Sequence, residues 1–343
     1  MPPNRLRRGD FVVEKNGDAL KTLERRPNGV FVSRPDAVDA ELRKLFDLQK
    51  ERIKNEPYFP VGGELEVMRA AYYANLPIIL KGPTGIAKST LVANFAVMMG
   101  LPMEKVPGEQ NISTSNSIGS VIPLEVEGMG VTMVYKDGPV ANFARSEKGA
   151  LLYITEANKI EGGMLSAFHT ITDYDRMLYI LVTGEHIPLS PKSAVITDYN
   201  PLYKGGLENL SPAFLQRFVH ITLEMPEQKK EQAIFEMKYG LRDRPGAPEL
   251  GKRAPRKADK ALIDALTKVA KDIRMGKDKN FDIIESPSPR LVDNAIKLVE
   301  QGLSPYYAVM HGLIQPLVDT LNGSYHAMLK VVDGFSTLLE GKP

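Results

Sequence analysis

Two hydrophobic periods alternate along the middle of the chain. Short, mostly apolar runs with the length of buried strands occur at residues 76–80, 103–106, 150–154, 193–197 and 219–223. Segments with helical spacing of their apolar residues, or with loop composition, separate these runs. Strands that alternate with helices are typical of a parallel sheet with helices on both faces. The pattern therefore predicts an α/β domain over residues 58–240.

The two ends of the chain depart from this pattern. Residues 1–57 mix charges with short β-like pieces and one amphipathic helix near residues 40–54, which is too little apolar surface for a separate core. We expect them to form an extension packed on the α/β domain. Residues 241–258 are rich in Arg, Lys, Pro and Gly and are interpreted as a surface linker. The helical period of residues 259–343 predicts a small all-α domain.

Two segments inside the α/β region have the pattern of β-hairpins. Leu124–Tyr135 alternates apolar and polar residues on both sides of a Gly128-Met129-Gly130 tip. Met177–Leu189, which contains Gly184, is a second candidate. The Gly-Met-Gly tip is equally typical of an exposed turn and of a loop that contacts a partner.

The segment between the first buried strand and the next helix carries the clearest chemistry. Gly82 and Gly85 precede Lys88 and Ser89 at the spacing of a phosphate-binding loop. Such a loop cradles phosphates with backbone N–H groups and a helix N-terminus, and it places a lysine on the β- and γ-phosphates and a hydroxyl on Mg²⁺. We expect nucleotide to be bound by Gly82, Pro83, Thr84, Gly85, Ile86, Ala87, Lys88, Ser89 and Thr90.

One position of this loop departs from the strict pattern. Ala87 stands where glycine is usual, but alanine adds only a Cβ and does not exclude the loop. The alternative is a plain Gly/Pro turn with an exposed lysine. A strand directly before the loop and an apolar helix directly after it favour the nucleotide interpretation.

Composition narrows the classes of function. Apolar residues make up 43% of the chain and charged residues 25%, which are ordinary globular values. The net charge of +2 gives no reason to expect nucleic acid as the main partner. The absence of cysteine excludes disulfides, thiolate metal sites and cysteine nucleophiles. With no signal-peptide pattern and no apolar run of membrane-spanning length, we expect a cytoplasmic protein without a membrane partner.

Phosphoryl transfer needs more than a phosphate cradle, and the further parts are sought at strand ends. Six short motifs follow one another: Lys81-Gly-Pro-Thr-Gly, Asp137-Gly-Pro, Tyr-Ile-Thr155-Glu156, Asp198-Tyr-Asn200-Pro201, Gln216-Arg217-Phe218 and Ser288-Pro289-Arg290-Leu291. In this order they resemble the AAA+ ATPases of the MoxR group, most closely the CbbQ/NirQ/NorQ branch. The resemblance implies a P-loop AAA+ core with a C-terminal helical lid domain, which binds and hydrolyses ATP with Mg²⁺.

The resemblance also implies a role for several residues. Lys88 would contact the phosphates, Ser89 would contact Mg²⁺, and Glu156 would orient or activate the attacking water. Thr155 departs from the family pattern, which has aspartate there and so brings a full negative charge toward the metal. A threonine hydroxyl at the metal is neutral, so Mg²⁺ binding should be weaker and hydrolysis slow or lost, although nucleotide binding could survive. Because Glu156 is retained, we favour a working but weak ATPase over an inactive one.

Three further residues match family positions outside the loop. Asn200 matches sensor 1 beside the γ-phosphate, Arg217 matches the arginine finger that reaches the nucleotide of the adjacent subunit, and Arg290 matches sensor 2 on the lid. Taken alone, Asn200 is usually a turn residue before proline, and each of the two arginines is more often a surface or helix-end ion pair than a nucleotide contact.

Two interpretations of the whole chain stay open. In the first, it is an ATPase that assembles as a homo-oligomeric ring, by resemblance of six subunits, and remodels or activates a client protein in a chaperone-like way. Relatives commonly act with a partner that carries a von Willebrand factor A domain. In the second, favoured by Thr155, the chain binds ATP as a structural or regulatory subunit and hydrolyses little. A nucleic-acid motor is disfavoured by the small net charge.

Overall fold

The computed structural model describes residues 10–15, 18–26, 28–54, 56–109, 113–126, 130–160, 162–201, 210–240, 258–277 and 286–317. By contacts the chain forms two compact units. The first unit holds residues 1–54, 62–82 and 88–222, and the second unit holds residues 55–61, 83–87 and 223–343. The two units are described separately below.

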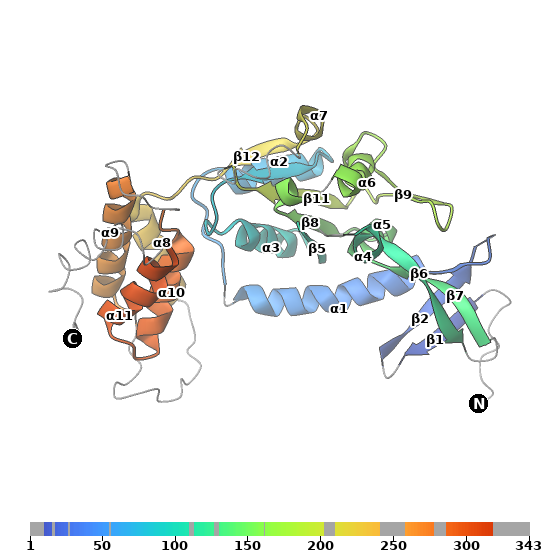
Figure 1. The fold of residues 1–343 in the computed structure, drawn as a ribbon, viewed down its shortest axis with the longest axis horizontal. Coiled ribbons are helices and arrows are strands. Elements are labelled where there is room, and N and C mark those ends of the chain that lie inside the picture. Colours follow the sequence, from blue (N-terminus) through green and yellow to red (C-terminus); the bar gives the residue numbers. More distant parts are fainter. Residues whose placement is uncertain are drawn as a thin grey trace. The chain divides into compact units, whose positions relative to one another are not determined.

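The centre of the first unit is a parallel sheet of five strands (Figure 1). Its strands are β4 (Ile78–Lys81), β5 (Met103–Pro107), β8 (Leu151–Thr155), β11 (Ala194–Tyr199) and β12 (Val219–Thr222), in the spatial order β12-β4-β11-β8-β5. All four pairings are parallel. The predicted strands and the predicted α/β class are confirmed.

The inner strands are apolar along most of their length because both faces of the sheet are covered. Ile78, Ile79 and Leu80 of β4 are buried, and so is every residue of β11. The helices of the unit are α1 (Pro35–Lys54), α2 (Glu64–Tyr73), α3 (Lys88–Met98), α4 (Thr114–Ser117), α5 (Pro139–Arg145), α6 (Gly162–Thr172) and α7 (Pro212–Leu215). Helix α1 packs on α3 and α5, and Figure 1 shows α2 on the opposite side of the strands from α3.

A second sheet joins the N-terminal residues to the first predicted hairpin. Its strands are β1 (Asp10–Lys15), β2 (Asp18–Arg25), β3 (Phe31–Ser33), β6 (Gly119–Val126) and β7 (Gly130–Asp137), in the order β1-β2-β3-β7-β6. The hairpin β6–β7 is confirmed by an antiparallel register that runs from Gly119↔Asp137 to Val126↔Gly130. The tip residues Gly128 and Met129 lie outside the described residues. The short β3 pairs in parallel with β7 at Phe31↔Val134, so the hairpin becomes part of a five-stranded sheet.

The second predicted hairpin is also present. It consists of β9 (Met177–Ile180) and β10 (Glu185–Pro188), which pair antiparallel across a turn that contains Gly184. Gly184 has a φ of 69°, a conformation that glycine adopts without a steric cost.

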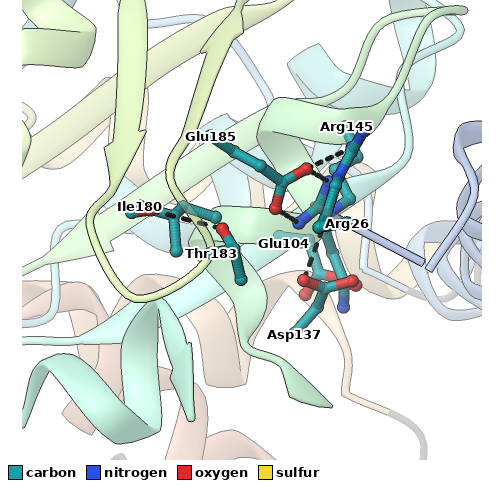
Figure 2. Close-up of polar contacts among 8 residues, drawn as sticks. Arg26, Glu104, Asp137, Arg145, Ile180, Thr183 and Glu185 are labelled. Atoms are coloured by element: carbon teal, nitrogen blue, oxygen red, sulfur yellow. Dashed lines mark hydrogen bonds and ion pairs between the residues drawn. The ribbon is translucent and has the colours of Figure 1, made fainter. Parts of the chain in front are cut away.

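A buried network of charged side chains holds this hairpin against the rest of the first unit (Figure 2). Arg145, at the end of α5, donates from Nη1 and Nη2 to the two oxygens of Glu185, each at 2.7 Å, and from Nε to Asp137 Oδ1 at 3.1 Å. Arg26 also pairs with Glu185. These four residues come from the segment after β2, the end of β7, α5 and the start of β10. The network therefore joins both hairpins to α5.

Burial by itself would raise the pKa of the Glu185 carboxyl. The hydrogen bonds and the charge of Arg145 outweigh burial and hold that pKa at about 2. Burial likewise opposes the charge of Arg145, but the hydrogen bonds to Glu185 and the charge of Asp137 raise its pKa instead. Both groups are therefore ionised at neutral pH.

The second unit contains the predicted all-α region. Its helices are α8 (Gln228–Gly240), α9 (Lys260–Lys277), α10 (Pro289–Glu300) and α11 (Pro305–Val309), and a π-helical turn, Met310–Ile314, and a 3₁₀ turn, Gln315–Leu317, continue α11. Their apolar faces form one core. The α/β range 58–240 expected from the sequence includes α8, but Phe235 and Tyr239 of this helix are buried in the helical core. Residues 241–257, of the expected linker, and the expected helix at residues 325–339 lie outside the described residues.

Candidate functional site

The site is built at the carboxyl edge of the parallel sheet. Strand β11 lies between β4 and β8, so the ends of three strands adjoin there. Strand β4 leads to the phosphate loop, β8 ends at Thr155, and β11 leads to Asn200. The backbone N–H of Gly82 donates to Tyr199 O at 3.2 Å, which fixes the start of the loop to the end of β11. Parallel α/β sheets bind their ligands at this edge.

Lys88 is the first residue of α3, and its side chain points back to the strand ends. The side chain is only 10% exposed. Its Nζ donates to Gly82 O at 2.8 Å and lies 3.7 Å from Asp198 Oδ2. The sequence motif singled out this lysine, but it did not reveal the carboxylate that faces it.

Asp198 is a buried carboxylate on β11 for which the sequence offered no role. It is 4% exposed, and its Oδ1 accepts the backbone N–H of Glu156 at 2.7 Å. Burial raises the pKa of Asp198, although the Glu156 N–H, the charge of Lys88 and a hydrogen bond from Tyr153 oppose that effect. Its signal in the sequence was an acidic residue inside a mostly apolar, buried strand.

Tyr153 connects Asp198 to the start of α3. Its hydroxyl lies 3.2 Å from Ser89 Oγ and also hydrogen-bonds the Asp198 carboxylate. Burial is the main reason why the pKa of Tyr153 is raised, so the phenol stays protonated. Ser89, Tyr153 and Asp198 therefore form one chain of hydrogen-bonding groups beneath the strand ends. Tyr153 begins the Tyr-Ile-Thr-Glu motif, but sequence reasoning gave it no role because it occupies an ordinary strand position.

Glu156 has a strained backbone directly after β8. Its φ of 49° and ψ of 47° lie in the left-handed region, which a non-glycine residue adopts at a cost of about 1 kcal/mol or more. Asp198 stabilises this conformation through the N–H of Glu156, and the Glu156 side chain pairs with Lys159 at 2.9 Å. Backbone strain of this kind clusters at functional sites.

Gly108 supports the same turn from the neighbouring strand. A Cβ at Gly108 would lie 2.2 Å from Thr155 O and 2.4 Å from Glu156 O, so only glycine fits without movement of that backbone. Sequence reasoning missed this glycine because it belongs to no motif. It follows β5, which pairs with β8 in parallel.

The phosphate loop itself, residues 83–87, belongs to the second unit. Gly85 has a φ of 80°, and a Cβ there would lie 2.2 Å from Ser288 Oγ. The backbone N–H of Arg290, on the first turn of α10, donates to Gly85 O at 3.3 Å. Ala87 has a φ of 68°, which explains why glycine is usual at that position. The structure thus brings Arg290 and Gly85 together, as residues of one unit.

The remaining predicted residues differ in their surroundings. Asn200 is buried directly after β11, at the same edge as Lys88. Arg217 follows α7 and pairs with Asp173 Oδ2 at 3.2 Å, and its Nη1 donates to the backbone of Ala213. These contacts of Arg217 are separate from those that link Lys88 to the ends of β8 and β11.

The donor set suits a magnesium ion that is held together with phosphates. Mg²⁺ prefers oxygen ligands and commonly takes one or two carboxylates, with phosphates and water completing its shell. The edge offers the hydroxyls of Ser89 and Thr155 and the carboxylate of Asp198. Among the described residues, no group of three or more His, Cys, Asp or Glu could hold a metal on its own. None of the described helices is long and apolar enough to cross a membrane.

Comparison with known proteins agrees with this geometry. The AAA domain (dynein-related subfamily) matches residues 77–218, and the CbbQ/NirQ/NorQ C-terminal domain matches residues 253–333. Protein NorQ of Paracoccus denitrificans is 33% identical over 262 residues, which cover 76% of this chain and 87% of NorQ. Protein CbbQ of Hydrogenophilus thermoluteolus is 29% identical over 268 residues, 78% of this chain and 91% of CbbQ.

A third relative is named for a regulatory role. The denitrification regulatory protein NirQ of Pseudomonas aeruginosa is 27% identical over 276 residues, which cover 80% of this chain and 96% of NirQ. The expected resemblance is thereby confirmed across both the nucleotide-binding and the C-terminal regions. The chain belongs to the CbbQ/NirQ/NorQ family of MoxR-group AAA+ ATPases.

Proposed function

We propose that this chain hydrolyses ATP with Mg²⁺ in a ring of identical subunits, and that the resulting change remodels or activates a partner protein. The observation that supports the proposal is the set of contacts among Lys88, Asp198 and Glu156 at the edge of the sheet. Lys88 faces Asp198 at 3.7 Å, and Asp198 holds the backbone of Glu156 at 2.7 Å. The buried side chain of Asp198 thus contacts both the lysine proposed to bind phosphate and the backbone of the glutamate proposed to act on the attacking water.

Each residue has a separate task in this proposal. Lys88 and the backbone of residues 82–90 hold the phosphates, and Ser89 offers its hydroxyl to the metal. Glu156 orients the attacking water or takes its proton, and Asn200 holds that water beside the γ-phosphate. Mg²⁺, when bound, neutralises charge on the phosphates. Arg290, on the first turn of α10, is the proposed sensor 2 residue.

The ring and the partner extend this proposal. The proposal that Arg217 acts on the nucleotide of an adjacent subunit rests on the resemblance at Gln216-Arg217-Phe218. Within its own chain Arg217 pairs with Asp173 and the α7 backbone. We propose six subunits and a cytoplasmic partner that carries a von Willebrand factor A domain. The relative NirQ, which is named a regulatory protein, supports action on other proteins.

The alternative is an ATP-binding structural subunit that hydrolyses little. Thr155 favours it, because a threonine stands where a metal-binding aspartate is expected. In that case ATP holds the ring together and its γ-phosphate persists. The retained Glu156, with its backbone held by Asp198, favours the hydrolysing form.

The test is hydrolysis measured beside nucleotide binding. Wild type, Glu156→Gln and the control Glu147→Gln, an exposed glutamate outside the site, are compared with Mg²⁺ present. We expect Glu156→Gln to lose hydrolysis about 100-fold or more while its affinity for ATP persists, and Glu147→Gln to behave as wild type. Tight binding without hydrolysis in all three proteins would establish the structural subunit instead.

A mixing experiment tests the ring. Lys88→Ala and Arg217→Ala should each be inactive, but for different reasons. If Arg217 acts on the adjacent subunit, mixed rings contain sites with an intact Lys88 beside an intact Arg217, and hydrolysis returns. A mixture that stays inactive, with mixed rings shown by mass measurement, contradicts action between subunits.

A further inference from the structure

The carboxylate that Thr155 cannot supply is present on the adjacent strand. We propose that Asp198 on β11 provides the carboxylate that faces the nucleotide-bound magnesium ion, in the place of an aspartate at position 155. The inference rests on the proposed ATP binding and extends it, because the loss of aspartate on β8 then no longer implies a weak metal site.

Strand register places Asp198 beside both neighbouring strands. On one side Thr197 pairs with Ile154 of β8, so Asp198 is level with Thr155. On the other side Asp198 pairs with Leu80 of β4, one residue before Lys81 and the start of the phosphate loop. An acidic residue on β11 is therefore adjacent to the phosphate-loop strand, whereas β8 is separated from that strand by β11.

The two oxygens of Asp198 have different surroundings. Oδ1 accepts the N–H of Glu156 at 2.7 Å, and Oδ2 faces Lys88 Nζ at 3.7 Å. A buried carboxylate is costly unless a cation lies close to it. When Lys88 engages the phosphates of a nucleotide, Oδ2 needs another positive charge. A magnesium ion on those phosphates meets that need.

The hydroxyl of Ser89 belongs to the same arrangement. Ser89 Oγ lies 3.2 Å from the Tyr153 hydroxyl, which also hydrogen-bonds Asp198. Tyr153 thereby holds together a hydroxyl at the start of α3 and a carboxylate on β11. One hydroxyl and one carboxylate, acting directly or through water, are the protein groups that a phosphate-bound Mg²⁺ commonly takes.

A purely structural role makes a different prediction. If Asp198 only holds the backbone of Glu156, any hydrogen-bond acceptor at position 198 suffices and the charge is irrelevant to Mg²⁺. If Asp198 serves the metal, its charge can be moved to position 155 without loss. The exchange variant Thr155→Asp with Asp198→Asn separates the two roles, because the asparagine Oδ1 can still accept the N–H of Glu156.

The experiment measures the affinity of a fluorescent ADP with and without Mg²⁺, and it does not depend on hydrolysis. The proteins are wild type, Asp198→Asn, the exchange variant and the control Asp39→Asn. Asp39 is also buried, but it accepts a hydrogen bond from Ser146 instead. We expect Mg²⁺ to strengthen ADP binding in wild type and in the control. In Asp198→Asn this gain should fall about 10- to 100-fold, and the exchange variant should regain it.

Three results would overturn the inference. If Mg²⁺ strengthens ADP binding by Asp198→Asn as much as it does for wild type, the metal does not interact with this carboxylate. A loss that the exchange variant does not repair assigns Asp198 to the Glu156 backbone alone. Wild type that binds no ADP, with or without Mg²⁺, overturns the proposed function together with the inference. Thermal unfolding of each variant identifies loss of fold, and where Asp198→Asn does not fold, the exchange variant decides the question.

Discussion

Arg145 and Glu185 form a two-pronged ion pair, with both N···O distances at 2.7 Å, in which both side chains are buried. Removal of one partner from a buried pair leaves the other charge buried without compensation. The resulting loss of folding free energy is larger than the net stabilisation that the intact pair provides. Arg145 also contacts Asp137, so the pair controls how the β9–β10 hairpin and β7 meet α5. Loss of either charge should therefore lower the stability of the first unit.

Glu185→Gln should lower the free energy of unfolding by about 3 kcal/mol, because Arg145 then stays buried with less than its full counter-charge. Denaturant unfolding at pH 7 measures the change. Glu147→Gln, at an exposed position, should change stability by less than about 0.5 kcal/mol. Equal stability of the two variants would show that the network contributes nothing.

The contribution of Glu185 should depend on pH with a definite sign. The folded pKa of about 2 lies below the unfolded value of 4.5, so its stabilisation is fully present above pH 4.5 and is lost as the pH falls through 2. The shift corresponds to about 3 kcal/mol. The stability difference between wild type and Glu185→Gln should therefore shrink between pH 5 and pH 2. If the stability difference between the two proteins stays constant over that range, the low pKa of Glu185 in the folded protein is contradicted.

Ala87→Gly should leave stability unchanged or raise it by up to about 1 kcal/mol. Ala87 has a φ of 68°, where glycine has no steric cost and alanine does. The matched change Ala93→Gly, inside helix α3, should instead destabilise by about 1 kcal/mol. Thermal or denaturant unfolding of both variants compares the two signs. A similar loss in both would place Ala87 in an unstrained conformation.

Gly108→Ala should reduce hydrolysis while nucleotide affinity changes little. The added Cβ would meet the carbonyl oxygens of Thr155 and Glu156 at 2.2 and 2.4 Å, so the turn that carries Glu156 must move. A displacement near 1 Å in a catalytic group can cost about 100-fold in rate. The control is Gly240→Ala, where a Cβ meets nothing within 4 Å. Separate measurements of kcat and of ADP affinity distinguish misplacement of Glu156 from loss of the binding site.

Thr155→Asp alone should not accelerate hydrolysis. If Asp198 already supplies the metal's carboxylate, a second acidic residue beside it adds like charge in a buried site. Steady-state ATP hydrolysis of wild type and Thr155→Asp over a range of Mg²⁺ concentrations tests this. A sharp rise in turnover would mean that the missing aspartate does limit the rate, and it would favour the interpretation in which the native chain hydrolyses little.

The sequence by itself determined the parts whose signal is local. Buried parallel strands are mostly apolar, so β4, β8 and β11 were visible as short runs. The phosphate loop has fixed spacing, so that spacing alone indicated Lys88 and Ser89 as candidate site residues. The β6–β7 and β9–β10 hairpins were visible from their alternation and glycines. The strand β2 was missed, because its run Asp18–Arg25 is mostly polar and has no clear period of two.

Only the tertiary structure decided which distant residues meet. The strand order β12-β4-β11-β8-β5 places β4 beside β11 and β12, which are far from it in the chain, so no sequence spacing indicates that Asp198 faces Lys88. The sequence gives no indication that Gly108 and Tyr153 matter, because their contacts form only where β5 and α3 pack on β8. The pairing of Arg145 with Glu185 joins positions 40 residues apart. Local chemistry is encoded in spacing, whereas a buried charge acquires its partner only when distant strands are brought together.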